Sequence, residues 1–252
     1  MFTSNPFAEL SASLPPAVMQ TYVVVMIILV AAGTLFDVVH KGSAKYFFAN
    51  WRKSKTKGSK AIGGGELASI AIKTGLVDFL ASGEFCNARR RVAHLLTMYG
   101  FLIHYITTAV MVFDASASAV WAQLWWIGGL MVCAGGYWFW FFIRVDVAAE
   151  GNSPFRVVRA DLFILSLLAS VTLGLLWAAA GGGAGVLFGL YLLATTVLFG
   201  SVPWSKFAHM FFKPAAAFEK RVSHAIGFRS NLPAPADKPE QFGSARQQPR
   251  HY

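Results

Sequence analysis

Long apolar runs separated by polar, basic segments form the main pattern of this chain. Each run is long enough to cross a hydrocarbon core of ~30 Å, because a helix rises ~1.5 Å per residue. The runs cover residues 17–36, 92–113, 120–143, 162–180 and 185–212. The last run contains Pro203, and Pro214 is expected to end it. The pattern predicts an all-α membrane protein with a five-helix bundle over residues 17–213.

Two shorter segments outside these runs have the period of an amphipathic helix. Between Glu66 and Leu80, apolar residues occupy positions 67, 70, 71, 76, 77 and 80. In the tail, Phe218, Val222 and Ile226 follow one another at intervals of four. This spacing predicts helices that lie on the membrane surface, although helices packed on the ends of the bundle would show nearly the same pattern.

The connections between the spans carry simpler signals. Residues 114–119 and the triplet Gly181-Gly182-Gly183 are short and predict tight turns. Five aromatic residues of the third span, at its two ends, indicate interfacial belts: Trp121, Trp125, Trp126, Trp138 and Trp140. Beyond Gly227 the tail is rich in proline, glutamine and charge, so the segment 214–252 is predicted to be partly disordered.

Composition supports the membrane class. The chain of 252 residues is 56% hydrophobic and only 13% charged, with a mean hydropathy of +0.51. The net charge of +10 does not indicate nucleic acid, because the basic residues are absent from the apolar runs and lie between them. Cys86 and Cys133 are far apart, which favours reduced packing residues and excludes a protein-borne iron–sulfur cluster or zinc site.

Charge also predicts the orientation. With five spans, the segments 37–91, 144–161 and 205–252 share one side, and they contain all 22 lysines and arginines. Basic residues favour the cytoplasmic side of a membrane. We therefore expect the polar N-terminal segment, residues 1–16, outside and the C-terminus in the cytoplasm, in the inner membrane of a bacterium.

Histidines next to basic residues are the candidate chemistry. His94 follows Arg91 by three residues, and His209 follows Lys206 by three. The charged neighbours must reach the interface, so both imidazoles are expected at one depth on different helices, as a six-coordinate haem requires. Arg91 and Lys206 would pair with the haem propionates. Gly100 would let a flat macrocycle approach the second span.

Other roles for the histidines stay open from the residues alone. His94 and His209 could equally be interfacial residues that hydrogen-bond to lipid or backbone. His104 lies ten residues beyond His94, roughly 15 Å deeper, where it would bind a second haem or line a quinone pocket. Tyr191 is the candidate side chain at that level on the fifth span. His40 is either an interfacial residue or a spare ligand.

These features resemble a known family. Five spans, the segments Arg91-Val92-Ala93-His94 and Tyr99-Gly100-Phe101, and the motif Trp204-Ser205-Lys206-Phe207-Ala208-His209 are similar to the nitrate reductase gamma-subunit family of membrane b-type cytochromes. The resemblance covers most of residues 17–213. The segment Gly75-Leu76-Val77-Asp78-Phe79-Leu80 looks like the membrane subunits of quinone-interacting oxidoreductase and heterodisulfide reductase complexes. The short length looks most like the anchors associated with dissimilatory adenylylsulfate reductase.

The resemblance implies specific roles. His94 and His209 would be the axial ligands of a haem b on the cytoplasmic side, and His104 would be one ligand of a second. Tyr191 stands where the family has the partner histidine, and the outer-side lysine that helps to bind quinol in the nitrate reductase member has no counterpart here.

The expected function is electron transfer between the quinone pool and a cytoplasmic iron–sulfur or flavoprotein oxidoreductase docked on the basic face. The alternative is a haem-free membrane anchor for such a complex. A small transporter is disfavoured, because the sequence shows no broken helix pair and no inverted repeat.

Overall fold

The computed structural model describes residues 2–40, 42–83, 85, 87–144, 156–205, 207 and 209–228, with backbone alone for residues 43, 160 and 209. The described residues form helices and turns, with no strand among them. They fall into two units, one made of Met1–Asp37 and Arg89–His209, the other of Val38–Ala88 and Met210–Tyr252. The predicted all-α class is confirmed.

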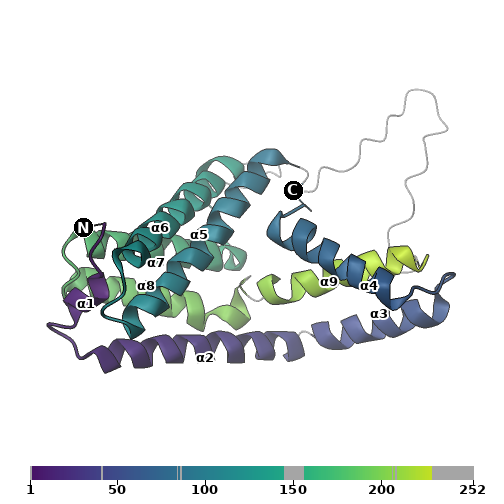
Figure 1. Cartoon of the computed structure of the whole chain (residues 1–252), viewed down its shortest axis with the longest axis horizontal. Coiled ribbons are helices and arrows are strands. Elements are labelled where there is room, and N and C mark those ends of the chain that lie inside the picture. The colour runs from purple at the N-terminus through teal and green to yellow at the C-terminus, as the bar shows by residue number, and fades with distance from the viewer. Residues whose placement is uncertain are drawn as a thin grey trace. The chain divides into compact units, whose positions relative to one another are not determined.

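The first unit contains the long apolar helices (Figure 1). Four helices of the described chain are long and apolar enough to cross a membrane, which identifies the architecture of a multi-pass membrane protein. They are α2 (Pro16–His40), whose last residues belong to the second unit, α5 (Ala88–Phe113), α6 (Ala119–Trp138) with its π-helical extension η2 (Phe139–Ile143), and α7 (Leu162–Ala179). All four coincide closely with predicted spans.

The fifth span differs from the prediction. Helix α8 (Val186–Gly200) has 15 residues, about 22 Å at helical rise, and a 3-10 turn η5 (Val202–Trp204) follows it. Pro203 has no N–H and disfavours α-helix at Val202, so α8 does not continue through this position. His209 consequently begins a separate helix, α9 (His209–Ala225), instead of ending the fifth span. Pro214 lies inside α9, so the expectation that it ends a helix is wrong.

Glycines allow α5 and α6 to pack closely. A Cβ added to Gly100 would lie 2.7 Å from the carbonyl oxygen of Gly128, and one added to Gly135 would lie 2.6 Å from that of Ala93. Small residues at helix contacts are typical of membrane bundles, since they let the backbones approach. The predicted turn between α7 and α8 is confirmed, because Gly181 and Gly182 have φ of +100° and +69°.

The N-terminal segment packs against the end of this bundle. Asn5 caps the short helix α1 (Pro6–Leu10) and donates a side-chain hydrogen bond of 3.0 Å to the Met111 carbonyl. Phe7 is 6% exposed and contacts the rings of Trp125 and Trp177. Trp125 is itself fully buried, so the prediction that it belongs to an interfacial belt is wrong. Its ring is covered by the chain's own N-terminus.

The second unit contains α3 (Ser43–Lys57), α4 (Gly64–Lys73), the π-helix η1 (Thr74–Leu80) and most of α9 (Figure 1). Trp51 of α3 stacks on Phe218 of α9, with ring centroids 5.7 Å apart, while Val222 and Ile226 are buried. Both predicted amphipathic segments are helical: residues 66–80 lie in α4 and η1, and Phe218 and Val222 lie in α9. Helix α3 was not predicted from the sequence.

Candidate functional site around His104

His104 is completely buried within the first unit. Its Nδ1 lies 3.0 Å from the backbone carbonyl oxygen of Trp125, and its ring stacks on that of Trp125 at 4.6 Å between centroids. A carbonyl oxygen can only accept a hydrogen bond, so Nδ1 carries the proton. Nε2 of the neutral ring therefore keeps its lone pair.

Nε2 of His104 has no hydrogen-bond partner among the described residues. A buried polar atom without a partner costs about 1–3 kcal/mol. Histidines that bind a metal typically donate Nδ1–H to a carbonyl and present Nε2 to the metal, and imidazole is a common axial ligand of haem iron. His104 thus has the tautomer and the unpartnered Nε2 that metal-binding imidazoles have.

Two glycines of α6 make this position of the ring accessible. A Cβ on Gly129 would lie 3.1 Å from Nδ1 of His104, and a Cβ on Gly128 would lie 2.7 Å from the His104 backbone nitrogen. Larger residues would separate the imidazole from the helix backbone. Gly129 is therefore a positioning residue that the sequence analysis missed. Its only sequence signal is the run of small residues in α6.

Hydrogen bonds connect His104 to Tyr191. Trp125 Nε1 donates to Thr108 Oγ1 at 2.8 Å, and the Thr108 hydroxyl donates to the His104 carbonyl at 2.8 Å. The Tyr191 side chain also hydrogen-bonds to Thr108. Tyr191 is 2% exposed and stacks on Trp177. The structure therefore brings two of the predicted residues into one buried network, although Tyr191 as an iron ligand stays a prediction.

A second row of hydroxyl groups crosses the interior beside this network. Tyr105 lies 2.9 Å from Ser170, which in turn lies 2.6 Å from Thr195, so the row joins α5, α7 and α8. Polar side chains in apolar helices usually face other helices, where they hydrogen-bond across the contact. These residues could have been found from the sequence, because each is a hydroxyl-bearing residue within an apolar run. They were not among the predicted site residues.

The predicted site at the basic end is described only in part. His94 and Arg91 are half-buried on α5. Gly100 faces α6, where the Gly128 backbone lies against its Cα, and its predicted contact with a macrocycle is not tested by this packing. Lys206 and the side chain of His209 lie outside the described residues, so whether His94 and His209 approach one iron stays a prediction.

One described residue of the 204–209 motif does contact α5. Phe207 is 2% exposed, and its ring centroid lies 5.9 Å from that of Phe101 and 5.9 Å from that of Phe199. Its backbone N–H donates to Ser205 Oγ at 3.2 Å. Phe207 is thus held against the helix that carries His94 and His104.

Metal ligation by a cluster of side chains is not seen in the described part of the chain. It contains no group of three or more histidines, cysteines or carboxylates that could hold an ion. Cys133 is a free thiol whose Sγ lies 3.7 Å from Thr172 Oγ1, and Cys86 lies outside the described residues.

The fold and site define a class: an all-helical, multi-pass membrane protein with a buried imidazole in its bundle. Comparison with protein-family models, with curated proteins and with solved structures found no match.

Proposed function

We propose that this chain is a haem b electron-transfer subunit of a bacterial inner membrane. It would pass electrons between the quinone pool and a cytoplasmic redox enzyme. The observation that carries the proposal is His104, whose Nδ1–H is held by the Trp125 carbonyl while the buried Nε2 has no partner among the described residues. Bound haem b supplies a one-electron redox centre.

Different residues of the chain are proposed to hold one haem or two. His104 would hold the haem iron through Nε2, and the Trp125 carbonyl fixes the tautomer and the orientation of the imidazole ring. His94 and His209 are proposed as the ligand pair for a haem near the basic end. Arg91 and Lys206 would hold its propionates at the wet edge.

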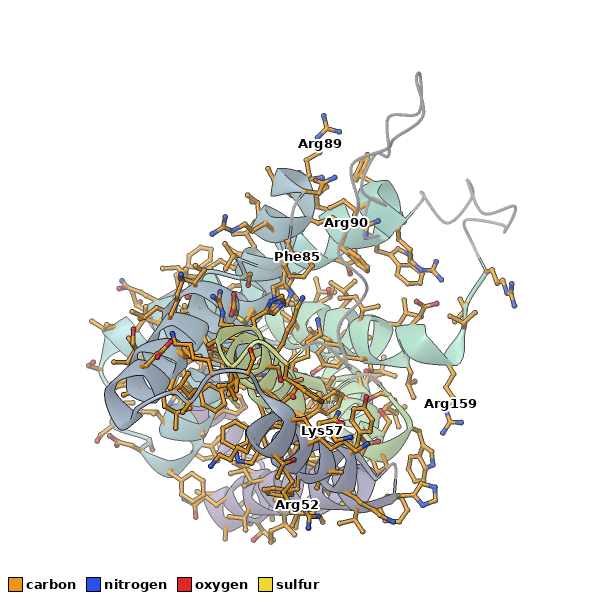
Figure 2. All side chains as sticks on the ribbon, turned by 90° about the vertical axis from the view of Figure 1, so that its right-hand side faces the viewer. Arg52, Lys57, Phe85, Arg89, Arg90 and Arg159 are labelled. Atoms are coloured by element: carbon orange, nitrogen blue, oxygen red, sulfur yellow. The ribbon has the colours of Figure 1, made fainter. Side chains whose placement is uncertain are left out.

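The proposed partner is an iron–sulfur or flavoprotein oxidoreductase, and adenylylsulfate reductase is the candidate that the sequence resemblance favours. Basic side chains line the segments proposed to face the cytoplasm. Figure 2 labels Arg52 and Lys57 of α3, and it shows Arg89 extending outward from the start of α5. Such charges would attract an acidic docking face and raise the association rate at low ionic strength.

Haem content tests the proposal directly. The purified full-length protein is expected to show a b-type α-band after reduction with dithionite, with one or two haems per chain by the pyridine haemochrome assay. His104→Leu is expected to lose one haem or shift its spectrum, because leucine has no lone pair to donate. The exposed His224→Ala serves as the matched histidine control and should keep the full haem content, because His224 has no proposed role as a ligand.

A haem-free anchor is the second candidate. It needs only the candidate membrane spans and the basic segments, which the first candidate shares. It predicts no haem in the wild-type protein. His104→Leu would then change stability little, because the loss of the hydrogen bond from Nδ1 to the Trp125 carbonyl is offset by removal of the buried Nε2 that has no partner among the described residues. Those two results together would replace the cytochrome proposal.

A further inference from the structure

A cleft with basic walls lies within the second unit. It has a volume of about 680 Å³ and runs between α4 with η1 on one side and α9 on the other. Volumes of ~300–1,000 Å³ are typical of sites that bind small molecules. Nothing in the proposed haem chemistry uses this cleft.

The charge of the cleft is positive. Its lining includes four lysines and arginines against two carboxylates: Lys73, Lys213, Lys220, Arg221, Glu66 and Asp78. Asp78 accepts two hydrogen bonds from Arg221, at 2.5 and 2.7 Å, so its charge is already matched. Glu66 lies 3.7 Å from Lys60. Lys73 and Lys220 therefore add positive charge to the cleft beyond these two ion pairs.

The electrostatics of Asp78 agree with this picture. The hydrogen bond from Arg221 is the largest cause that holds the pKa of Asp78 below its ordinary value, and the charges of Lys220 and Lys73 act in the same direction. Both lysines thus attract the negative charge of the Asp78 carboxylate. They would attract an anion that enters the cleft in the same way.

Exposed apolar side chains lie on the same helices as the basic walls. Ile72 is 62% exposed, Leu76 57% and Leu80 41%, all on α4 or η1. A helix with one apolar, outward face and a basic face is typical of the membrane interface. The chain connections agree, because this unit follows directly on the candidate span α2 and leads into the candidate span α5.

From these observations we infer that the cleft between α4–η1 and α9 binds the phosphate headgroup of an anionic membrane lipid. The acyl chains of that lipid would lie on the exposed apolar face of η1. An acidic peptide from a partner protein would satisfy the lysines, but it would leave Ile72, Leu76 and Leu80 in water. Lipid is the occupant that matches both the charged and the apolar surfaces.

The test is a lipid titration of the purified full-length protein in detergent, followed by native mass spectrometry. Phosphatidylglycerol, zwitterionic phosphatidylcholine, inorganic phosphate and a glutamate-rich peptide are compared as probes. The double variant Lys73→Gln/Lys220→Gln removes two charges from the cleft. Its matched control, Lys53→Gln/Lys57→Gln, removes two exposed charges from α3 that do not line the cleft.

We expect phosphatidylglycerol to bind in preference to phosphatidylcholine, and the cleft variant to weaken this binding by at least about tenfold, since each basic residue near anionic lipid contributes about 1 kcal/mol. The control variant should retain wild-type binding. Equal binding of the two lipids, or equal losses in the two variants, would overturn the inference. So would binding of phosphate alone without a lipid preference, or displacement of the lipid by the peptide at lower concentration. Haem content is independent of all these outcomes.

Discussion

At the scale of single residues, the position of one imidazole depends on one missing methyl group. A Cβ at Gly129 would lie 3.1 Å from Nδ1, so the glycine lets the His104 ring reach the Trp125 carbonyl without a shift. The hydrogen bond then determines the tautomer and leaves Nε2 as the available lone pair. The chemistry proposed for His104 therefore depends on a residue that makes no polar side-chain contact of its own.

Gly129→Ala tests this dependence. The new Cβ would lie 3.1 Å from His104 Nδ1 and 2.8 Å from a methyl carbon of Leu175, so the imidazole or the leucine must shift. We expect the free energy of unfolding to fall by about 1–3 kcal/mol, as for other overpacked sites. If haem is bound, its absorption band should also shift. Thermal unfolding monitored by circular dichroism measures the change in stability.

Gly189→Ala is the control, since nothing lies within 4 Å of a Cβ at that position of α8. Alanine stabilises a helix interior relative to glycine by up to about 1 kcal/mol, so this variant should unfold at the wild-type temperature or above it. Similar destabilisation by both substitutions would show that the contact with His104 is not what matters.

At the scale of helices, a buried ion pair joins the end of η2 to the start of α7. Arg144 hydrogen-bonds to both oxygens of Asp161 and lies over the Trp140 ring at 4.0 Å. Asp161 belongs to the 3-10 turn η4 (Arg159–Asp161) and also accepts from the Val158 backbone N–H at 2.9 Å. Both charged residues are less than 10% exposed. This ion pair holds the end of the third candidate span against the start of the fourth.

Arg144→Ala is expected to destabilise the protein by about 3–5 kcal/mol, because it leaves the Asp161 carboxylate buried without its cation. The double variant Arg144→Ala/Asp161→Asn should recover part of the loss, since the buried charge is then gone. Thermal unfolding in detergent measures both. Arg159→Ala is the comparison: this exposed arginine donates one hydrogen bond to the Trp204 carbonyl, so its loss should cost at most about 1.5 kcal/mol, less than the loss of Arg144. No recovery in the double variant would argue against the ion pair as the cause.

At the scale of the whole molecule, segments distant in sequence hold the second unit together. Asp78 and Arg221 are 143 residues apart, and their ion pair ties η1 to α9. The pKa of Asp78 is lower in the folded state than its ordinary value, mainly because of the hydrogen bond from Arg221. The carboxylate therefore contributes stability that is fully present above about pH 4, the ordinary value for aspartate, and is lost as the pH falls through the folded value.

The difference in unfolding temperature between the wild type and Asp78→Asn is accordingly expected to be largest near pH 7 and to shrink below about pH 4. Thermal unfolding across a pH series measures it. Glu66→Gln removes an exposed carboxylate from the same unit and should show a smaller difference at every pH. A difference for Asp78→Asn that does not change with pH would contradict the linkage.

The sequence by itself determined the helical class, four of the spans, the glycine turn after α7 and the two amphipathic segments. Each of these features depends on local composition or periodicity, which does not require tertiary contacts. Pro203 was noted as an interruption, but the sequence alone did not show that α8 stops at Gly200 and that His209 begins a new helix.

The tertiary structure alone decided which faces meet. In an apolar helix, side chains that face lipid and side chains that face protein have the same hydrophobicity, so hydropathy does not separate them. Trp125 therefore looked interfacial until the N-terminal Phe7 was seen to cover it, and Gly129 had no visible role until the imidazole was seen beside it. The protonation of His104 likewise follows from a carbonyl on another helix, and local sequence contains no information about that contact.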